Sequence, residues 1–485
     1  MRILFLDLDT LRPDHLGCYG YHRNTSPNLD WIASDGVRFT EYYCANAPCL
    51  PSRAALVSGQ FGIRSGIEGH GGTASDLRLE GRDRGFTSDF AQHSLWEFLR
   101  RSGYYTASVS PFAERHSAWW FNAGFREQVD PGKGGMESAE EVTPLVKDWL
   151  SRHAEEDNWL LHVNYWDPHT PYRAPAEFGN PFADEPLPDW MTEEVIREHN
   201  ALPGGHSSRE VNMWNDGTTE RWPRHPGEVR DMDGFRQMID GYDCGIRYMD
   251  DHIGQILDHL REAGVLDETI IIVTSDHGEN LGELNCYGEH GTSDTITHRI
   301  PMLIRWPGCQ SGTVDDGLHY NLDLGPTLAE MLGREPRPQW QGESYAAALR
   351  DGTPTGRDHL VLSQCCHGCM RSVRFGPWHY IRTIHDFYHL YPREMLFNVE
   401  QDPHLQHDLA AERPDVCGEG ARLYLGWHEE MMAGNLDAVD PLWTVMQEGG
   451  PFHSRGVLPA YLERLQATGR QQHVEELRRR HPEEL

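Results

Sequence analysis

Residues that could bind a metal ion or transfer a proton end or closely follow three apolar segments of this sequence. They are Asp9 at the end of 2–9, His169 shortly after 160–165, and Asp276 and His277 after 269–274. Two carboxylates and one imidazole suit a divalent cation: oxygen ligands favour Ca²⁺ or Mg²⁺, and the imidazole also allows Mn²⁺. A histidine such as His169 can protonate a leaving alcohol. We therefore expect metal-assisted acid–base chemistry, with Ca²⁺ as the first candidate ion.

Each of these residues also has a purely structural interpretation. Asp276 and His277 could form a turn and cap a helix. His169, in a turn bracketed by prolines, could pack on a nearby tyrosine. Asp7 shares a strand face with Asp9, and we expect it to be a buried, hydrogen-bonded carboxylate rather than a ligand. The functional interpretation is favoured because open α/β sheets bind ligands at the carboxyl ends of their strands.

The apolar segments predict buried strands of a mostly parallel sheet. They lie at 2–9, 160–165, 269–274 and 302–306, and a helical pattern covers 236–263. This alternation predicts an α/β catalytic domain over 1–358, with a large, mostly parallel sheet flanked by helices. Residues 175–232 are rich in Pro, Gly, Asn and Asp, and we expect them to form a long excursion near the rim of the active site.

Strand-like segments recur at 360–363, 370–374 and 378–383, which predicts a smaller antiparallel-sheet subdomain over 359–455. Residues 456–485 are expected to form a helical tail. Apolar residues recur in this tail at helical spacing: Val457, Leu458, Tyr461, Leu462 and Leu465. Such a stripe must cover its own domain or a neighbouring copy. We favour a neighbouring copy, and hence a homo-oligomer formed through the tail.

The net charge of −32 argues against nucleic acid and anionic membranes as partners. An anion-binding site must therefore create its own positive field from a metal ion, arginines and histidines. The sequence has no apolar run of 18 residues and no signal peptide, so a chain that starts naturally at Met1 is expected to be cytoplasmic. Three cysteines cluster, Cys365, Cys366 and Cys369, and we expect structural thiols rather than a disulfide framework or half of a zinc site.

A further motif, Cys49-Leu50-Pro51-Ser52-Arg53, adds a candidate nucleophile. Together with segments elsewhere, it resembles the signature of the formylglycine-dependent sulfatase family in the alkaline-phosphatase-like superfamily. The resemblance extends from residue 3 to about residue 410, and the order and spacing of its segments make it specific. The other segments lie at 9–17, 167–172, 274–279 and 299–308.

The resemblance implies a sulfuric ester hydrolase in which a maturation enzyme oxidises Cys49 to formylglycine (3-oxoalanine). A hydrated aldehyde has two oxygens, one to hold a metal ion and one to attack sulfur. Arg53 would hold this hydrate, and His169 would contact the sulfate and act as the general acid. The metal ligands would be Asp9, Asp276, His277 and the modified Cys49.

The sequence departs from the family pattern at two places. Many members carry a lysine and a histidine after the strand that corresponds to 103–107, whereas here Arg115 and His116 could supply the charge and the base from a longer loop. His290 stands where many members have a sulfate-binding lysine, and the charge of a histidine depends on pH. An ordinary loop role is the alternative for both histidines, and His70 is a weaker candidate still.

The alcohol portion of the substrate is not readable from the sequence. The Trp119-Trp120 pair could stack on a sugar, so we favour a carbohydrate sulfate over another small-molecule O-sulfate. A phosphonate monoester or phosphodiester hydrolase on the same scaffold is the nearest alternative activity. A binding protein with unmodified Cys49 is the alternative outside catalysis.

Overall fold

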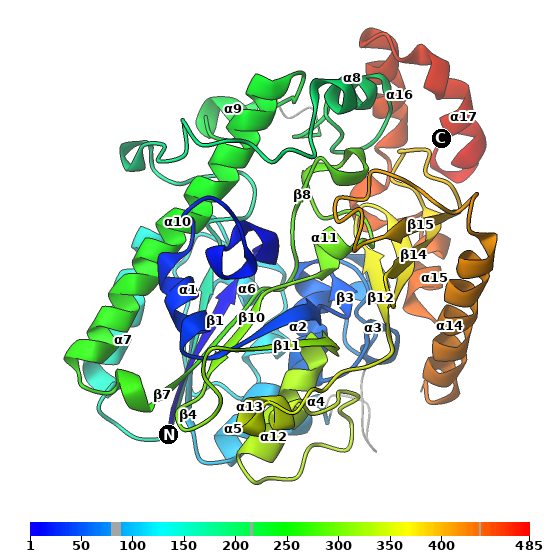
Figure 1. Cartoon of the computed structure of the whole chain (residues 1–485). Helices are drawn as coiled ribbons and strands as arrows, with labels where there is room; N and C mark the ends of the chain where they lie inside the picture. Colours follow the sequence, from blue (N-terminus) through cyan, green and yellow to red (C-terminus); the bar gives the residue numbers. More distant parts are fainter. Residues whose placement is uncertain (79–88, 214–216, 436–437) are drawn as a thin grey trace.

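A computed structural model of the chain describes residues 1–78, 89–213, 217–435 and 438–485. Its centre is an eight-stranded sheet of order β11-β2-β10-β7-β1-β6-β4-β5 (Figure 1). Strand β10 runs antiparallel to both of its neighbours, and the other pairs are parallel. The large, mostly parallel sheet is thereby confirmed. Its strands are β1 (Arg2–Leu8), β2 (Val37–Tyr43), β4 (Tyr105–Val109), β5 (Glu127–Val129), β6 (Trp159–Tyr165), β7 (Thr269–Thr274), β10 (Met302–Arg305) and β11 (Thr313–Tyr320).

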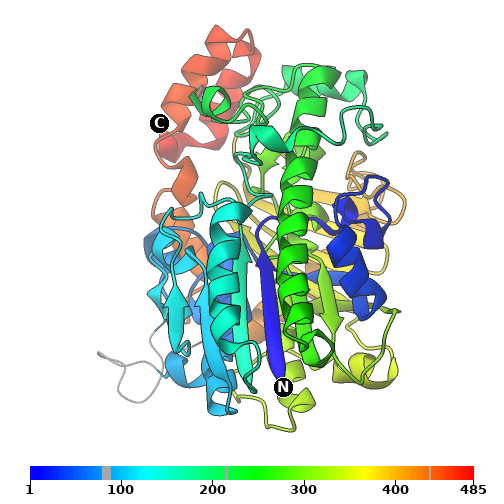
Figure 2. The ribbon, with the colours of Figure 1, turned by 90° about the vertical axis from the view of Figure 1, so that its left-hand side faces the viewer.

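Helices cover both faces of this sheet, which explains why its strands are apolar throughout. Ile3 and Phe5 of β1 pack on one face, and Leu4, Leu6 and Leu8 pack on the other, as the two-residue period of a strand requires. Helices α7 (Ala139–His153) and α10 (Met232–Glu262) cover the leucine side, where Figure 2 shows them side by side. Helices α2 (Cys49–Ser58), α5 (Leu95–Arg101) and α12 (Leu324–Met331) cover the opposite face.

Four neighbouring parallel strands, β7, β1, β6 and β4, end at the same edge of the sheet. The register pairs Asp7 of β1 with Thr274 of β7 on one side and with Asn164 of β6 on the other. The residues that follow these strands are therefore neighbours in space, although they lie up to 270 positions apart in the sequence, near 9 and near 276. This edge is where the sequence predicts the site.

A second sheet has the order β15-β14-β13-β12-β3. Its four C-terminal strands are antiparallel, which confirms the smaller antiparallel sheet, but the fifth strand, β3, comes from just before Cys49 and pairs parallel to β12. Cys365 and Cys369 face each other across β12 and β13 and form a disulfide, so the expectation of free thiols there was wrong. Hairpin register, which the sequence spacing does not reveal, brings them together. The strands are β3 (Asn46–Ala47), β12 (His359–Cys365), β13 (Cys369–Phe375), β14 (Trp378–His385) and β15 (Glu394–Asn398).

The predicted helical tail is present as α16 (Leu458–Ala467) and α17 (Val474–Arg480). Its apolar stripe packs on Phe387 and Tyr388 of the same chain, so the expectation that it faces a neighbouring copy was wrong. Helical spacing shows that a face must be covered but not by what. The excursion at 175–232 contains α8 (Glu193–Ala201) and α9 (Gly217–Arg221), and Gly204 within it hydrogen-bonds Tyr461 of the tail.

Other helices connect these layers. They include α1 (Pro27–Ser34), α6 (Phe112–Arg115), α11 (Thr295–His298), α13 (Ala346–Asp351), α14 (Pro414–Ala433) and α15 (Pro441–Gln447). Within the described ranges, none of the helices combines the length and the apolar character that crossing a membrane requires.

Candidate active site

Four side chains predicted to bind a metal ion converge at the shared edge of the large sheet. The ligand atoms of Asp9, Cys49, Asp276 and His277 all lie within 4.8 Å of one another, and all four residues are buried. Asp9 follows β1, Asp276 and His277 follow β7, and Cys49 is the first residue of α2. The arrangement joins two strand ends and a helix N-terminus.

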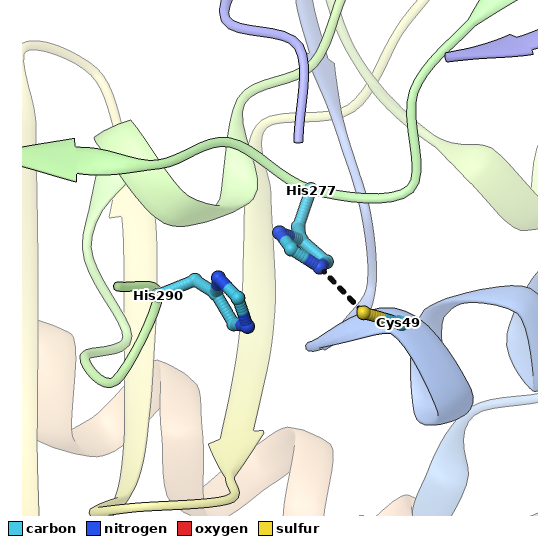
Figure 3. A group of neighbouring side chains, drawn as sticks. All are labelled: Cys49, His277 and His290. Carbon is cyan, nitrogen blue, oxygen red and sulfur yellow. Dashed lines mark hydrogen bonds between the residues drawn. The ribbon is translucent and has the colours of Figure 1, made fainter. Parts of the chain in front are cut away.

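Local hydrogen bonds fix which atoms point into the site. The backbone N–H groups of Thr10 and His277 donate to Asp276 Oδ1, at 3.1 and 2.9 Å. His277 Nδ1 donates to the Gly278 carbonyl at 2.8 Å, which leaves Nε2 as the free ring nitrogen. That nitrogen lies 3.1 Å from Cys49 Sγ (Figure 3). The sulfur occupies the position that the oxygens of a hydrated formylglycine would take.

Arg53 lies one helical turn after Cys49 and contacts three carboxylates. Its Nε and Nη2 donate to the two oxygens of Asp7 at 2.7 and 2.9 Å, which confirms Asp7 as a buried, hydrogen-bonded carboxylate. Its Nη1 donates to Asp9 Oδ2 at 3.0 Å and to Asp276 Oδ2 at 2.5 Å. One guanidinium faces three carboxylates, and the buried Asp9 Oδ1 has no hydrogen-bond partner. These residues fit a divalent cation, which would satisfy that oxygen.

The protonation states at this edge follow from burial and from the neighbouring acids. Burial, then the charge of Asp276, raises the pKa of Asp9 well above its usual range. Burial, then Asp9 and Asp276, likewise raises the pKa of the Cys49 thiol. An unmodified Cys49 is therefore a protonated thiol rather than a reactive thiolate.

His169 faces the metal-ligand group from the end of β6. Its Nδ1 donates to the Thr170 carbonyl at 2.5 Å, so Nε2 is the atom turned towards the site, 4.0 Å from Asp9 Oδ1. Arg173 stabilises this turn by donating to the carbonyls of Trp166 and His169, at 3.0 and 3.1 Å. Our sequence analysis missed Arg173; its position four residues after His169, in the same proline-rich turn, was the available signal.

Arg115 and His116 lie in the wall next to Cys49. The Arg115 guanidinium stacks over Trp166 at 4.8 Å, and its positive charge acts on both Asp9 and Cys49. The His116 ring lies 4.9 Å from the ring of His70, and the buried His116 Nε2 has no hydrogen-bond partner. His70 Nε2 accepts from the backbone N–H of Leu50 at 3.3 Å, so this residue is closer to the motif than the sequence indicated.

His290 closes the opposite side, with its ring 4.1 Å from that of His277 (Figure 3). Its Nδ1 lies 3.2 Å from Glu279 and its Nε2 lies 3.2 Å from Glu289, two acids that the sequence analysis missed. Burial outweighs these acids and lowers the pKa of His290 to about 3. His290 is therefore a neutral ring, and the fixed positive charges nearby are those of arginines.

Comparison with known proteins gives a consistent result. The sulfatase family model matches residues 2–334. A choline-sulfatase of Rhizobium meliloti (strain 1021) is 27% identical over 450 residues, with 80% of this chain and 78% of that protein covered. An N-acetylglucosamine-6-O-sulfatase of Bacteroides thetaiotaomicron is 25% identical over 418 residues, with 73% and 72% covered.

Solved structures share the fold. One, described as a complex with its substrate D-glucosamine-2-N,6-O-disulfate, superposes with a TM-score of 0.69 at 19% identity, covering 90% of this chain and 99% of that one. The phosphonate monoester hydrolase of Agrobacterium radiobacter superposes with a TM-score of 0.68 at 20% identity, covering 89% and 96%. The family match spans more than two thirds of the chain, and the family implies a metal ion and a formylglycine. The chain therefore belongs to the sulfatase family and is a sulfuric ester hydrolase.

Proposed function

We propose that this sulfatase hydrolyses O-sulfate esters of a carbohydrate, with a formylglycine made from Cys49 and a Ca²⁺ ion bound by Asp9, Asp276 and His277. The convergence of these four side chains within 4.8 Å carries the proposal. Three of the four ligand positions would offer oxygen, which favours Ca²⁺, with Mg²⁺ or Mn²⁺ as the outcomes that metal analysis distinguishes. A formylglycine-generating maturation enzyme is the partner that this chemistry requires.

Bound at this position, the ion and the hydrated formylglycine would supply a Lewis acid and a hydroxyl nucleophile. Arg53 orients the oxygens that replace Cys49 Sγ, because its guanidinium is fixed by Asp7. Arg115 and His290 hold the outer sulfate oxygens. His169, once protonated on both ring nitrogens, donates the Nε2 proton to the leaving alcohol and returns to the neutral ring whose Nδ1–H is held by the Thr170 carbonyl.

His116 is assigned the second proton transfer. Its Nε2 is buried and unpartnered, and its ring packs in the same wall as the motif. A neutral imidazole with a free nitrogen can accept the remaining hydroxyl proton of the formylglycine hydrate. The burial and the neighbouring Arg115 lower the pKa of His116, which keeps it in the neutral, accepting form.

The carbohydrate is favoured by the relatives, one of which is named as an N-acetylglucosamine-6-O-sulfatase and another of which was solved with a disulfated glucosamine. The named choline-sulfatase makes choline sulfate the small-molecule alternative. The similar superposition on a phosphonate monoester hydrolase supports phosphonate ester hydrolysis as a second candidate activity.

The test is a comparison of kcat/KM on N-acetylglucosamine 6-sulfate, choline sulfate and a phenyl phosphonate ester, with protein co-expressed with a maturation enzyme. The sugar sulfate is expected to be the best substrate, and a higher value on the phosphonate ester would contradict the proposal.

The role of His169 is tested by adding 4-nitrophenyl sulfate to this panel. Loss of a general acid costs about 10²–10⁴-fold, and His169→Ala should lose most on sugar sulfates and least on 4-nitrophenyl sulfate, whose leaving group needs no proton. Equal losses on both would remove His169 from this role.

A further inference from the structure

A second group of possible metal ligands lies beside the active site, outside the residues used above for catalysis. The ligand atoms of His206, Glu289 and His367 lie within 4.8 Å of one another. Glu289 ends β9 (Tyr287–Glu289), His206 lies in the segment after α8, and His367 lies in the turn between β12 and β13. The group thus joins three segments that are distant in the sequence, and the carboxylate at its centre is buried.

A hydrogen bond at the edge of this group fixes which ring nitrogen of His206 carries the hydrogen. His206 Nδ1 lies 2.7 Å from the Val211 carbonyl, which can only accept, so Nδ1 carries a hydrogen. In the neutral ring, Nε2 then presents a lone pair, and this atom lies 3.5 Å from Glu289 Oε2. His367 Nδ1 lies 3.2 Å from Glu289 Oε1 and is a buried atom without a hydrogen-bond partner. The lone pair of His206 Nε2 therefore faces the Glu289 carboxylate, and a positive centre between them, either a proton or a metal ion, would remove this repulsion.

The spacing of these atoms leaves room for a metal ion. Two ligand atoms at about 2.0–2.1 Å from a tetrahedral zinc are about 3.3–3.4 Å apart; His367 Nδ1 and His206 Nε2 lie 3.2 and 3.5 Å from different oxygens of Glu289, so each carboxylate oxygen faces one imidazole. The Val211 carbonyl fixes the His206 ring in the way that outer partners fix metal-binding histidines. His206 also has a φ of 49°, a left-handed conformation that non-glycine residues rarely adopt, and it aims the ring at Glu289.

We propose that His206, Glu289 and His367 bind a Zn²⁺ ion, with a fourth coordination position left open. Two imidazoles and one carboxylate form a ligand set that suits zinc better than Ca²⁺. This site is separate from the one at Asp9 and does not depend on which ester the enzyme cleaves. Glu289 Oε1 also accepts from the backbone N–H of His290 at 3.0 Å. By fixing Glu289, the ion would therefore also fix the backbone of His290, the residue assigned to the sulfate.

The test measures zinc binding on the full-length chain, apart from turnover. The Asp276→Asn variant removes a ligand of the first site and serves as the parent; after dialysis against zinc, loss of the proposed site is read as one Zn²⁺ per chain fewer than in this parent by mass spectrometry, because the group of Cys49, His277 and His290 is common to all the variants. Adding His206→Gln or His367→Gln should weaken zinc binding by more than about 100-fold, since loss of an outer partner alone costs about 10–100-fold. His453→Gln is the matched control, because its ring stacks on His367 at 4.8 Å but it belongs to a different group of possible metal ligands, with His70 and Cys366.

Retention of zinc in the His453 variant and its loss in the other two would support the site. Zinc that is absent from the Asp276→Asn variant, or lost only with His453, would overturn the proposal, and the positive centre would then be a proton. Should the glutamine variants unfold, Co²⁺ added to the Asp276→Asn variant provides a second measurement. Visible absorption typical of four-coordinate Co²⁺ with nitrogen and oxygen ligands supports the site, and an octahedral, water-like spectrum contradicts it.

Discussion

Two buried clusters of this protein are each built around an arginine, and they differ in how completely their carboxylate oxygens are hydrogen-bonded. Arg371 of β13 pairs with Glu68 and Asp440. All four carboxylate oxygens of this cluster accept hydrogen bonds. The other donors are Asn46, Ser363, His428 and the backbone N–H of Leu442. Such a cluster holds the small sheet to its surroundings and leaves no atom for a ligand.

The cluster around Arg53 has the same kind of centre but one more carboxylate. Asp7, Asp9 and Asp276 share a single guanidinium, and Asp9 Oδ1 remains unpartnered. A buried charge without a partner is costly, so an excess of this kind indicates that a cation belongs there. The comparison shows that a buried carboxylate oxygen left without a partner, rather than burial or the presence of an arginine, separates a candidate site from a structural cluster.

The largest expected effect comes from removing Cys49, the proposed source of the nucleophile beside the Arg53 cluster. Cys49→Ala should lower kcat by about 10⁶-fold, the scale for loss of a nucleophile, while the far-UV spectrum stays unchanged. In matured wild-type protein the peptide that contains residue 49 should be lighter by about 18 Da, for thiol to aldehyde. Cys244→Ala is the matched control, because Cys244 is also buried but its thiol faces the Gly179 carbonyl, away from the Arg53 cluster. Turnover that survives in Cys49→Ala would refute the assigned nucleophile.

Replacing each of the two arginines in turn tests the comparison between their clusters directly. Arg371→Met leaves buried carboxylates unmatched and should lower the free energy of unfolding by ~3–5 kcal/mol, with kcat of the folded protein unchanged. Arg53→Met should lower kcat by about 10²–10³-fold. Arg53→Lys keeps the charge but loses the two-atom contact with Asp7, so it should restore only part of this activity. The comparison fails if Arg371→Met reduces kcat as strongly as Arg53→Met does.

Much of the fold and part of the site follow from sequence for identifiable reasons. Strands β1, β6 and β7 are continuous apolar runs, and the polar residues after them meet because parallel strands end together. Asp9, Asp276 and His277 were predictable in this way. Their proximity to Cys49 was predictable only through the family resemblance, because α2 packs across the sheet and no local pattern fixes its position.

The remaining residues depend on packing between distant segments. Glu289 meets His206 and His367 through loops without periodicity, and Arg173 acts through backbone carbonyls, so its position after His169 was the one signal that the sequence offered. The shifted pKa of His290 depends on burial, which overrides the acidic composition. The domain boundaries at 358 and 455 stay predictions, although β3 shows that the small sheet also uses a strand near residue 46.

A smaller effect is expected on stability when the ion is removed from the Arg53 cluster. A ligand present at 100 times its Kd stabilises the folded state by about 2.7 kcal/mol, so adding Ca²⁺ to chelator-treated protein should raise Tm. Asp276→Asn should abolish this rise, because it removes a ligand. His367→Gln should retain it, since that side chain belongs to the other metal-ligand group. A Ca²⁺-dependent rise in Asp276→Asn would place the ion elsewhere.

In a third cluster, in the tail, a protonated histidine compensates the charges of two acids. His481 lies 2.8 Å from Asp386 and 3.1 Å from Glu484, so its two ring nitrogens face two acids. Burial disfavours the charged ring, but the hydrogen bonds to these acids prevail and raise the pKa of His481 to about 9. The other titratable or charged groups at this junction are Arg480, His385 and Tyr388. Here an imidazolium supplies the charge that a metal ion would supply at the Arg53 cluster.

The smallest expected effect follows from that proton. Because the folded-state pKa of His481 lies above the unfolded value near 6.5, the stabilisation is fully present below pH 6.5 and is lost as the pH rises to about 9. The free energy of opening α17, from amide exchange corrected for intrinsic rates, should therefore fall over this window by at most ~1.4 kcal/mol per pH unit. His481→Gln should remove the slope. His473→Gln should keep it, because that partly buried ring contacts the Ala201 carbonyl rather than an acid. An unchanged slope in His481→Gln would show that the tail cluster is not balanced by this proton.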